Sequence, residues 1–147
     1  MIVVSDTTPL ISLLKIGRLD LLKKLFGEIF IPQAVFNELT VDERFQMEAN
    51  QIKNEKFILV KTVNNLESVG ILKRAVGLDQ GESEAIVLAD ELKADLLLMD
   101  EAKGRKVSVE MGHRIIGTIG ILMASYEEQK LTSDEVKDCI AGLQRSG

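Results

Sequence analysis

Short apolar runs rich in β-branched residues alternate along the chain with longer stretches in which apolar positions recur at helical spacing. The short runs predict five strands, at residues 2–4, 28–31, 57–60, 95–99 and 113–116. The longer stretches predict helices at residues 10–16, 19–25, 32–39, 40–50, 80–92, 101–111, 118–129 and 132–143. Alternation of this kind indicates a mostly parallel sheet with helices on both faces.

Local signals mark the ends of these helices. Gly17 separates the first helix from the second, and Pro32 starts the third. A capping-box pair, in which Thr, Asn or Asp is followed three residues later by Glu, marks four further helix starts. These pairs are Thr40 with Glu43, Asn64 with Glu67, Asp79 with Glu82, and Thr132 with Glu135.

The length and composition of the chain bound its architecture. The 147 residues suit one domain, residues 1–147, which is long enough for a three-layer core and too short for two such cores. Apolar residues make up 46% of the chain and charged residues 28%, as in ordinary globular proteins. The expected fold class is therefore α/β, with a mostly parallel central sheet of about five strands.

Hydropathy and cysteine content indicate where the protein works. The longest apolar runs, at residues 94–99 and 115–123, fall well short of the ~20 residues that span a bilayer. The amino terminus has no basic region and no small-residue cleavage site, so we expect neither a membrane segment nor export. Cys139 is the only cysteine, which suits a reducing compartment. The expected location is the cytoplasm.

The formal net charge of −5 bears on the partners of the protein. It argues against a broad basic face that holds nucleic acid. A cluster of carboxylates would supply part of this negative charge and would be neutralised by bound cations, while lysines can still gather around a cleft. The negative charge therefore argues against a nucleic-acid substrate more than against a site made of carboxylates.

Two aspartates follow predicted strands. Asp6 comes after the strand at residues 2–4, and Asp100 comes after the strand at residues 95–99. Because ligands of open parallel sheets bind beyond the carboxyl ends of the strands, parallel strands would bring both carboxylates to one edge. Taken singly, each aspartate is also explained as a turn or helix-capping residue. As a pair they are the strongest indication of a site that the pattern offers.

Two glutamates on predicted helices are further candidates. Glu38 shares a helix face with apolar residues, where a carboxylate is costly to desolvate unless it meets a cation or hydrogen-bond donors, although a glutamate at a helix end also reaches water. Asp79 and Glu82 are explained as the two halves of a capping box. Glu84 has no such role, so it ranks first as a ligand from this segment and Glu82 second.

Four carboxylates suit a hard divalent cation. Mg²⁺ and Mn²⁺ prefer oxygen ligands, and one or two such ions can activate water and stabilise charge on a phosphodiester. Cys139 and the single His113 offer no ligand set for a transition metal, and His113 is expected to pack in a loop or lie on the surface. The expected ligands are Asp6, Glu38, Glu84 and Asp100.

Four motifs occur in an order that resembles PIN domains, and the match covers nearly the whole chain. They are Val-Val-Ser-Asp-Thr-Thr-Pro-Leu at residues 3–10, Asn-Glu-Leu at 37–39, Gly-Glu-Ser-Glu-Ala-Ile at 81–86 and Leu-Met-Asp-Glu at 98–101. A Gly-Thr-Ile-Gly-Ile-Leu segment at residues 117–122 resembles a less studied branch. PIN domains include the VapC-like toxins of toxin–antitoxin pairs. The resemblance implies an α/β/α sandwich, metal-dependent ribonuclease activity and frequent homodimers.

The resemblance also assigns roles to residues. The family acids fall on the same four carboxylates that the pattern indicates. The hydroxyl that often follows the first acid would be Thr7 or Thr8, and Thr118 stands near where a further polar residue reaches the metal. The chain departs from the commonest toxin pattern by a glutamate at the start of the third motif, where aspartate is frequent, and by Glu101 and Arg105 after the last acid.

These assignments imply hydrolysis of RNA by water that Mg²⁺ or Mn²⁺ activates, which leaves a 5′-phosphate and a 3′-hydroxyl. Lys103, Arg105 and Lys106 are candidate phosphate contacts, although a solvated helix face explains them as well. The apolar helices at residues 118–126 and 136–143 suit either a homodimer or core packing.

A non-catalytic PIN-fold module that binds a protein partner, such as an antitoxin, is the alternative, and the acidic charge favours it. Phosphatase chemistry of the haloacid dehalogenase type is disfavoured, because it needs a second acid where this chain has Thr8. Dinucleotide binding is disfavoured as well, because no Gly-x-Gly-x-x-Gly motif follows the first strand.

Overall fold

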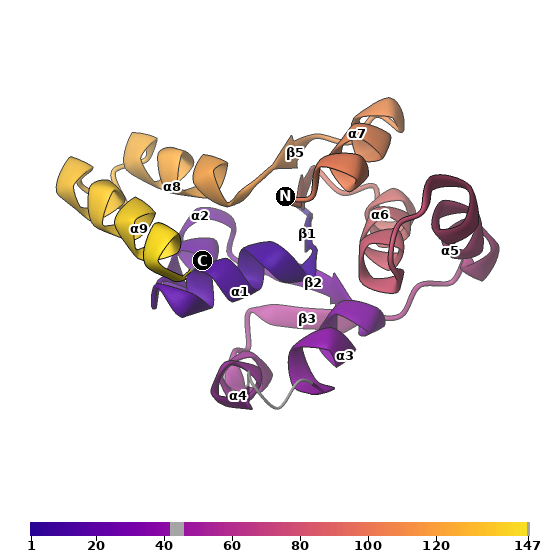
Figure 1. Cartoon of the computed structure of the whole chain (residues 1–147), viewed down its shortest axis with the longest axis horizontal. Helices are drawn as coiled ribbons and strands as arrows, with labels where there is room; N and C mark the ends of the chain where they lie inside the picture. Colours follow the sequence, from indigo (N-terminus) through magenta and orange to yellow (C-terminus); the bar gives the residue numbers. More distant parts are fainter. Residues whose placement is uncertain (42–45, 147) are drawn as a thin grey trace.

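The centre of the computed structural model, which describes residues 1–41 and 46–146, is a parallel five-stranded sheet (Figure 1). All four neighbouring pairs of strands are parallel, in the order β3-β2-β1-β4-β5. The strands are β1 (Val3–Ser5), β2 (Ile29–Pro32), β3 (Ile58–Lys61), β4 (Leu96–Leu98) and β5 (Ile115–Ile116). The predicted parallel sheet of about five strands is confirmed.

Helices connect the strands and cover both faces of the sheet. They are α1 (Thr7–Lys15), α2 (Asp20–Phe26), α3 (Gln33–Val41), α4 (Gln46–Asn54), α5 (Leu66–Ile71), the π-helical turn η2 (Leu72–Val76), α6 (Gln80–Leu92), α7 (Ala102–Glu110), α8 (Thr118–Glu127) and α9 (Ser133–Ser146). Within the described part of the chain, no helix is long and apolar enough to cross a membrane.

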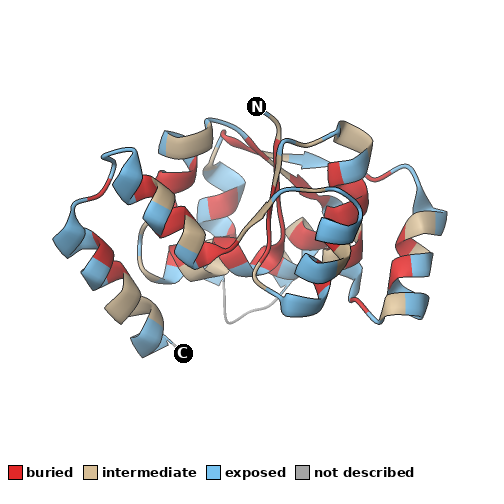
Figure 2. Ribbon diagram, turned by 90° about the horizontal axis from the view of Figure 1, so that it is seen from above, coloured by how far each residue is buried: buried red, intermediate tan, exposed pale blue. Residues whose placement is uncertain are grey.

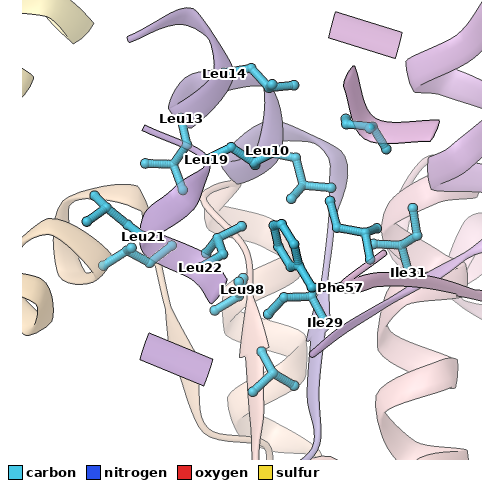
Figure 3. Close-up of a cluster of buried hydrophobic side chains, with 14 of the residues drawn as sticks. Leu10, Leu13, Leu14, Leu19, Leu21, Leu22, Ile29, Ile31, Phe57 and Leu98 are labelled. Carbon is cyan, nitrogen blue, oxygen red and sulfur yellow. The ribbon is translucent and has the colours of Figure 1, made fainter. Parts of the chain in front are cut away.

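Alternating side chains of the central strands feed two apolar clusters, one on each face of the sheet. Val3 and Leu98 belong to the cluster that α1, α2, α8 and α9 cover, part of which is drawn in Figure 3. Val4 and Leu97 belong to the cluster that α5 and α6 cover. Buried residues follow the sheet and the inner helix faces, while the outer helix faces are exposed (Figure 2). The three-layer α/β/α sandwich is thereby confirmed.

Helix α6 shows how local sequence and packing agree. Asp79 Oδ1 accepts from the Glu82 N–H at 2.8 Å, and Glu82 Oε1 accepts from the Asp79 N–H at 3.3 Å, so the predicted capping box forms. Buried apolar residues at 85–89 then fix the helix against the sheet. The Thr132 and Glu135 pair at the start of α9 is confirmed in the same way.

Three predicted boundaries were wrong. Helix α1 starts at Thr7 and not at residue 10, and Pro9 is accommodated because it lies in the first turn. Pro32 ends strand β2, so α3 begins at Gln33. Asn65, one residue after the predicted Asn64, caps α5 by accepting from the Ser68 N–H at 3.0 Å.

The predicted start of a helix at Thr40 was also wrong. Thr40 lies inside α3, where its hydroxyl donates to the Phe36 carbonyl at 2.9 Å, a bond within the helix and not a cap. Glu43, the other half of that predicted pair, lies outside the described residues. The helix that follows, α4, is described from Gln46 to Asn54.

Candidate functional site

The order of the strands defines where a ligand is expected. From β1 the chain continues to β2 and β3 on one side, and it later places β4 and β5 on the other side. The strand order therefore reverses between β1 and β4, which is the position where open parallel sheets bind ligands at their carboxyl ends. Asp6 follows β1, and its N–H donates to the Leu98 carbonyl of β4 at 2.9 Å. Asp100 lies two residues beyond Leu98, so both aspartates flank the reversal.

Asp6 is buried in a setting that disfavours its charged form. Only 4% of the residue is exposed, and burial raises the pKa of its carboxyl from 3.8 to about 7. A hydrogen bond from the Thr7 backbone opposes burial and lowers that pKa, and the negative charges of Asp79, Glu38 and Asp100 each raise it to a lesser extent. Asp6 stands at the N-cap position of α1, yet its side chain makes no capping hydrogen bond. Helix capping therefore does not account for this aspartate.

Asp100 is held by the start of α8. Its Oδ1 accepts from the Thr118 N–H at 2.7 Å, and its Oδ2 accepts from the Thr118 hydroxyl at 2.6 Å. A Cβ at Gly117 would lie 2.7 Å from Asp100 Oδ1, so a glycine allows this close approach. Glu101, not Asp100, caps α7 by accepting from the Gly104 N–H at 2.7 Å. The supporting position predicted for Thr118 is thus beside Asp100.

Glu38 lies where α1, α3 and α6 meet. Its Oε2 accepts from the Thr7 hydroxyl at 2.8 Å, whereas Thr8 is exposed on α1. A Cβ at Gly81 would lie 2.9 Å from the Glu38 Cδ and closer still to its Oε1. The residue as a whole is exposed, but its carboxylate lies against these neighbours, and burial raises its pKa, with the charges of Asp79 and Glu84 acting in the same direction.

Glu84 connects α6 to the start of α3. Its Oε1 accepts from the Ala34 N–H at 3.2 Å, and its Oε2 accepts from the Gln80 side-chain amide at 2.6 Å. The Ala34 N–H belongs to the first turn of α3, where backbone N–H groups have no acceptor within the helix. Glu84 is therefore oriented by two donors, one on each oxygen.

Glu82 belongs to the predicted capping box of α6. Burial, together with the neighbouring carboxyl groups of Asp79 and Glu101, raises the pKa of Glu82 to about 8. The same neighbourhood, led by the Gly104 N–H, lowers the pKa of Glu101. The charge of Asp79 raises the pKa of both Asp6 and Glu38, so Asp79 stands beside the site as well as capping α6.

The candidate phosphate contacts lie on α7 and are exposed. Arg105 has its Nη1 2.8 Å from the point that a Cβ at Gly117 would occupy, and with Asp100 and Ile119 it lines a surface pocket. Lys103 and Lys106 are exposed elsewhere on the helix. Arg105 is therefore the cation of this group that stands next to a candidate ligand.

The side chains present fit a divalent cation by their chemistry. Within residues 1–41 and 46–146, no group of three or more His, Cys, Asp or Glu side chains is already close enough to hold one ion. The donors are nevertheless carboxylate oxygens, which Mg²⁺ and Mn²⁺ prefer. Burial, with three like charges nearby, disfavours the charged form of Asp6, and a cation at this edge would favour that form.

Two partners of the candidate ligands, Gln80 and Gly81, are not predicted from the sequence. Gln80 stands four residues before Glu84, a spacing that brings side chains together on a helix and could have indicated the pair. Gly81 was read only as part of a motif, although its missing side chain makes room for Glu38. Only the packing of α3 on α6 reveals that second relation.

The family comparison agrees with the fold. A family model described as a PIN domain matches residues 2–147. The chain therefore belongs to the PIN-domain family, as the resemblance of its motifs indicated, and PIN domains are generally nucleases. A search of curated proteins found no match.

Proposed function

We propose that the protein is a Mg²⁺- or Mn²⁺-dependent endoribonuclease. In this proposal Asp6, Glu84 and Asp100 hold one or two ions, and Glu38 binds directly or through water. The observation that carries it is the environment of Asp6. Its side chain is buried, makes no capping hydrogen bond and lies near like charges where the strand order reverses. A cation nearby would stabilise the charged form of a carboxylate in that position.

The chemistry follows from the donors and their supports. When bound, the ions would supply an activated water and stabilise charge on the phosphodiester. The chain's own contribution is orientation: Thr118 holds Asp100, the Ala34 N–H holds Glu84, and Thr7 holds Glu38. Because water and not the ribose 2′-hydroxyl attacks, the products would carry a 5′-phosphate and a 3′-hydroxyl.

Binding of RNA would depend on local cations, since the net charge is −5. Arg105 beside Asp100 is the first candidate for a phosphate contact, and Lys103 and Lys106 on the same helix extend the positive charge. A single strand would fit this arrangement better than a duplex, which needs a broad basic face.

Calorimetric titration with Mn²⁺ tests the ligands, and incubation with labelled single-stranded RNA tests the activity. The parent protein should bind Mn²⁺ and cleave RNA, and Asp6→Asn should lose both. Asp134→Asn, an exposed change on α9, is the matched control and should retain both. An Asp6→Asn protein that cuts RNA as fast as the parent would show that the site assignment is wrong.

The alternative is a non-catalytic module that holds a protein partner such as an antitoxin. It requires neither Mn²⁺ binding nor RNA cleavage, so the same two measurements separate it from the enzyme. The uncapped, buried Asp6 favours the enzyme, because a surface for protein binding gains nothing from a buried carboxylate with a raised pKa. A role as the toxin of a toxin–antitoxin pair would add toxicity of the active protein that a partner relieves.

A homodimer is proposed on the outer face of α8. Ile119, Met123 and Tyr126 recur at helical spacing and are 52%, 43% and 47% exposed. Met123→Glu should shift the protein toward monomer in light scattering, while Met47→Glu on α4, where the methionine is 84% exposed, should not. Equal masses for both variants and the parent would remove this surface from consideration.

Two further expectations are retained as proposals. Residues 1–147 form one domain, since the central strands β1 and β4 contribute to both apolar clusters. A cytoplasmic location agrees with Cys139, which is buried and carries a free thiol.

A further inference from the structure

A chain of hydrogen bonds leads from η2 to one of the proposed ligands. Lys73 Nζ donates to Gln80 Oε1 at 2.6 Å, and Gln80 Nε2 donates to Glu84 Oε2 at 2.6 Å. The other oxygen of Glu84 accepts from the Ala34 N–H at 3.2 Å. The first two links have no role in the proposed function.

The π-helical turn places Lys73 at the start of this chain. Helix α5 passes directly into η2, which ends at Val76 and is capped by Gly77 in the left-handed conformation with φ of 83°. The Leu78 N–H then donates to the Leu72 carbonyl at 3.3 Å, which folds the start of α6 back against η2. Lys73 and Gln80, seven residues apart, thereby face each other. Single π-helical turns are frequent at functional sites, where they redirect a side chain.

The ammonium group also fixes which way the Gln80 amide points. A lysine ammonium carries three donors and no acceptor, so the Gln80 atom that faces it must be the carbonyl oxygen. The amide NH₂ is then left facing Glu84, where it acts as a donor to the carboxylate. The Glu84 carboxylate only accepts, so it favours the same orientation of the amide. Lys73 therefore reinforces the interaction that Glu84 receives.

We propose that Gln80 is a positioning residue for Glu84 and that Lys73 orients Gln80. Each carboxylate oxygen of Glu84 has two lone pairs, and the Gln80 and Ala34 donors occupy one on each oxygen. The remaining lone pairs stay available to a cation while the side chain is held in one orientation. The inference rests on the proposed function, because it assigns the support of a ligand of that same site.

A merely structural role makes a different prediction. A Gln–Glu pair four residues apart on a helix adds a small stabilisation whether or not Glu84 binds a cation. Loss of a support that orients a metal ligand instead typically lowers metal affinity 10- to 100-fold. The dissociation constant for Mn²⁺ therefore distinguishes the two roles, and thermal stability alone does not.

The test is calorimetric titration of the full chain with Mn²⁺ alone. Gln80→Leu should weaken Mn²⁺ binding by about 10- to 100-fold with little change in Tm, since Gln80 is exposed. Lys73→Met should also weaken Mn²⁺ binding, by a smaller factor, because the Gln80 amide then loses one of the two partners that orient it. Arg74→Met is the matched control. Arg74 is the neighbouring exposed cation of η2, its guanidinium lies against Gly70, and its loss should leave the dissociation constant unchanged.

Glu84→Gln separates failure of this inference from failure of the proposed function. Mn²⁺ binding that is lost in Glu84→Gln but unchanged in Gln80→Leu and Lys73→Met would overturn the positioning role and leave the proposed function standing. Parent-like Mn²⁺ binding by Glu84→Gln would remove Glu84 from the ligands, which would overturn the inference and the assignment of Glu84 in the proposed function. Weakening in Arg74→Met equal to that in Lys73→Met would reduce the effect to the loss of a general positive charge and would likewise overturn the inference.

Discussion

Asp6 shows most clearly how burial can disfavour the charged form of a carboxyl group that is proposed as a metal ligand. An ordinary aspartate is ionised well below neutral pH, but burial brings the pKa of Asp6 to about 7. In the absence of a cation the folded protein therefore favours the protonated side chain more than the unfolded chain does. A proton and a divalent cation would compete for the same oxygens, which links stability, pH and metal at this residue.

Without metal, the free energy of unfolding should fall as the pH rises. The folded pKa of Asp6, about 7, lies above its unfolded value of 3.8, so the stabilisation is complete below pH ~4 and is lost as the pH rises through ~7. The loss should amount to at most roughly 4 kcal/mol. Urea unfolding in EDTA measures it, and Asp6→Asn should remove this component of the slope. An identical pH dependence in both proteins would contradict the burial argument.

The Thr118 hydroxyl should matter more than an ordinary buried hydroxyl. Its hydrogen bond to the Asp100 carboxylate is charge-assisted, so Thr118→Val should cost roughly 1.5–3 kcal/mol in denaturant unfolding. Ser125→Ala on the same helix removes a neutral bond to the Ile121 carbonyl and should cost less, about 0.5–1.5 kcal/mol. Equal losses would show that the Asp100 bond carries no added stability.

At the scale of elements, the sequence predicted what local signals determine. The bounds of α6 agree with the prediction because a capping box starts it and apolar periodicity carries it to Leu92. The helix starts predicted at Pro32 and Thr40 were wrong, although each residue type suits a helix start. Pro32 instead pairs with β3 as the last residue of β2, and Thr40 continues α3. The π-helical turn was not predicted, since nothing in composition distinguishes it from the end of α5.

The packing of α8 against β5 should depend on Gly120. A Cβ there would press on the Ile116 side chain close to its branch point, which cannot move far, so Gly120→Ala should lower stability by roughly 1–2 kcal/mol despite the better helix propensity of alanine. Gly70→Ala on α5 meets only the flexible end of Arg74 and should be neutral or stabilising by up to about 1 kcal/mol. Thermal or denaturant unfolding of the two variants checks this, and the reverse order would contradict it.

At the scale of the whole molecule, strand order brings residues that are far apart in the sequence to one edge of the sheet. Asp6 and Asp100 could be paired from the sequence because each follows a strand, and the parallel β1 and β4 place both at one edge. The contact of Glu38 with Thr7 and Gly81 could not be foreseen, because it requires three helices to pack together. From its position on a predicted helix, Glu38 could be either a ligand or a helix-end glutamate that reaches water. The resemblance to PIN domains indicated the ligand.

The charge of the whole molecule sets the conditions for substrate binding. With a net charge of −5, affinity for RNA should rely on few phosphate contacts, chief among them Arg105. In the proposed function, divalent cations should therefore aid binding as well as chemistry, because they would neutralise the acidic edge that the RNA would approach.

The most direct measurement is the cleavage of a 5′-labelled single-stranded RNA, with the chemical ends of the products identified. In Mn²⁺ the parent protein should produce fragments with a 5′-phosphate and a 3′-hydroxyl, and neither the parent in EDTA nor Asp6→Asn in Mn²⁺ should produce them. Cleavage that persists in EDTA, products that end in a cyclic phosphate, or equal cleavage by Asp6→Asn would contradict a metal-dependent nuclease built on these carboxylates.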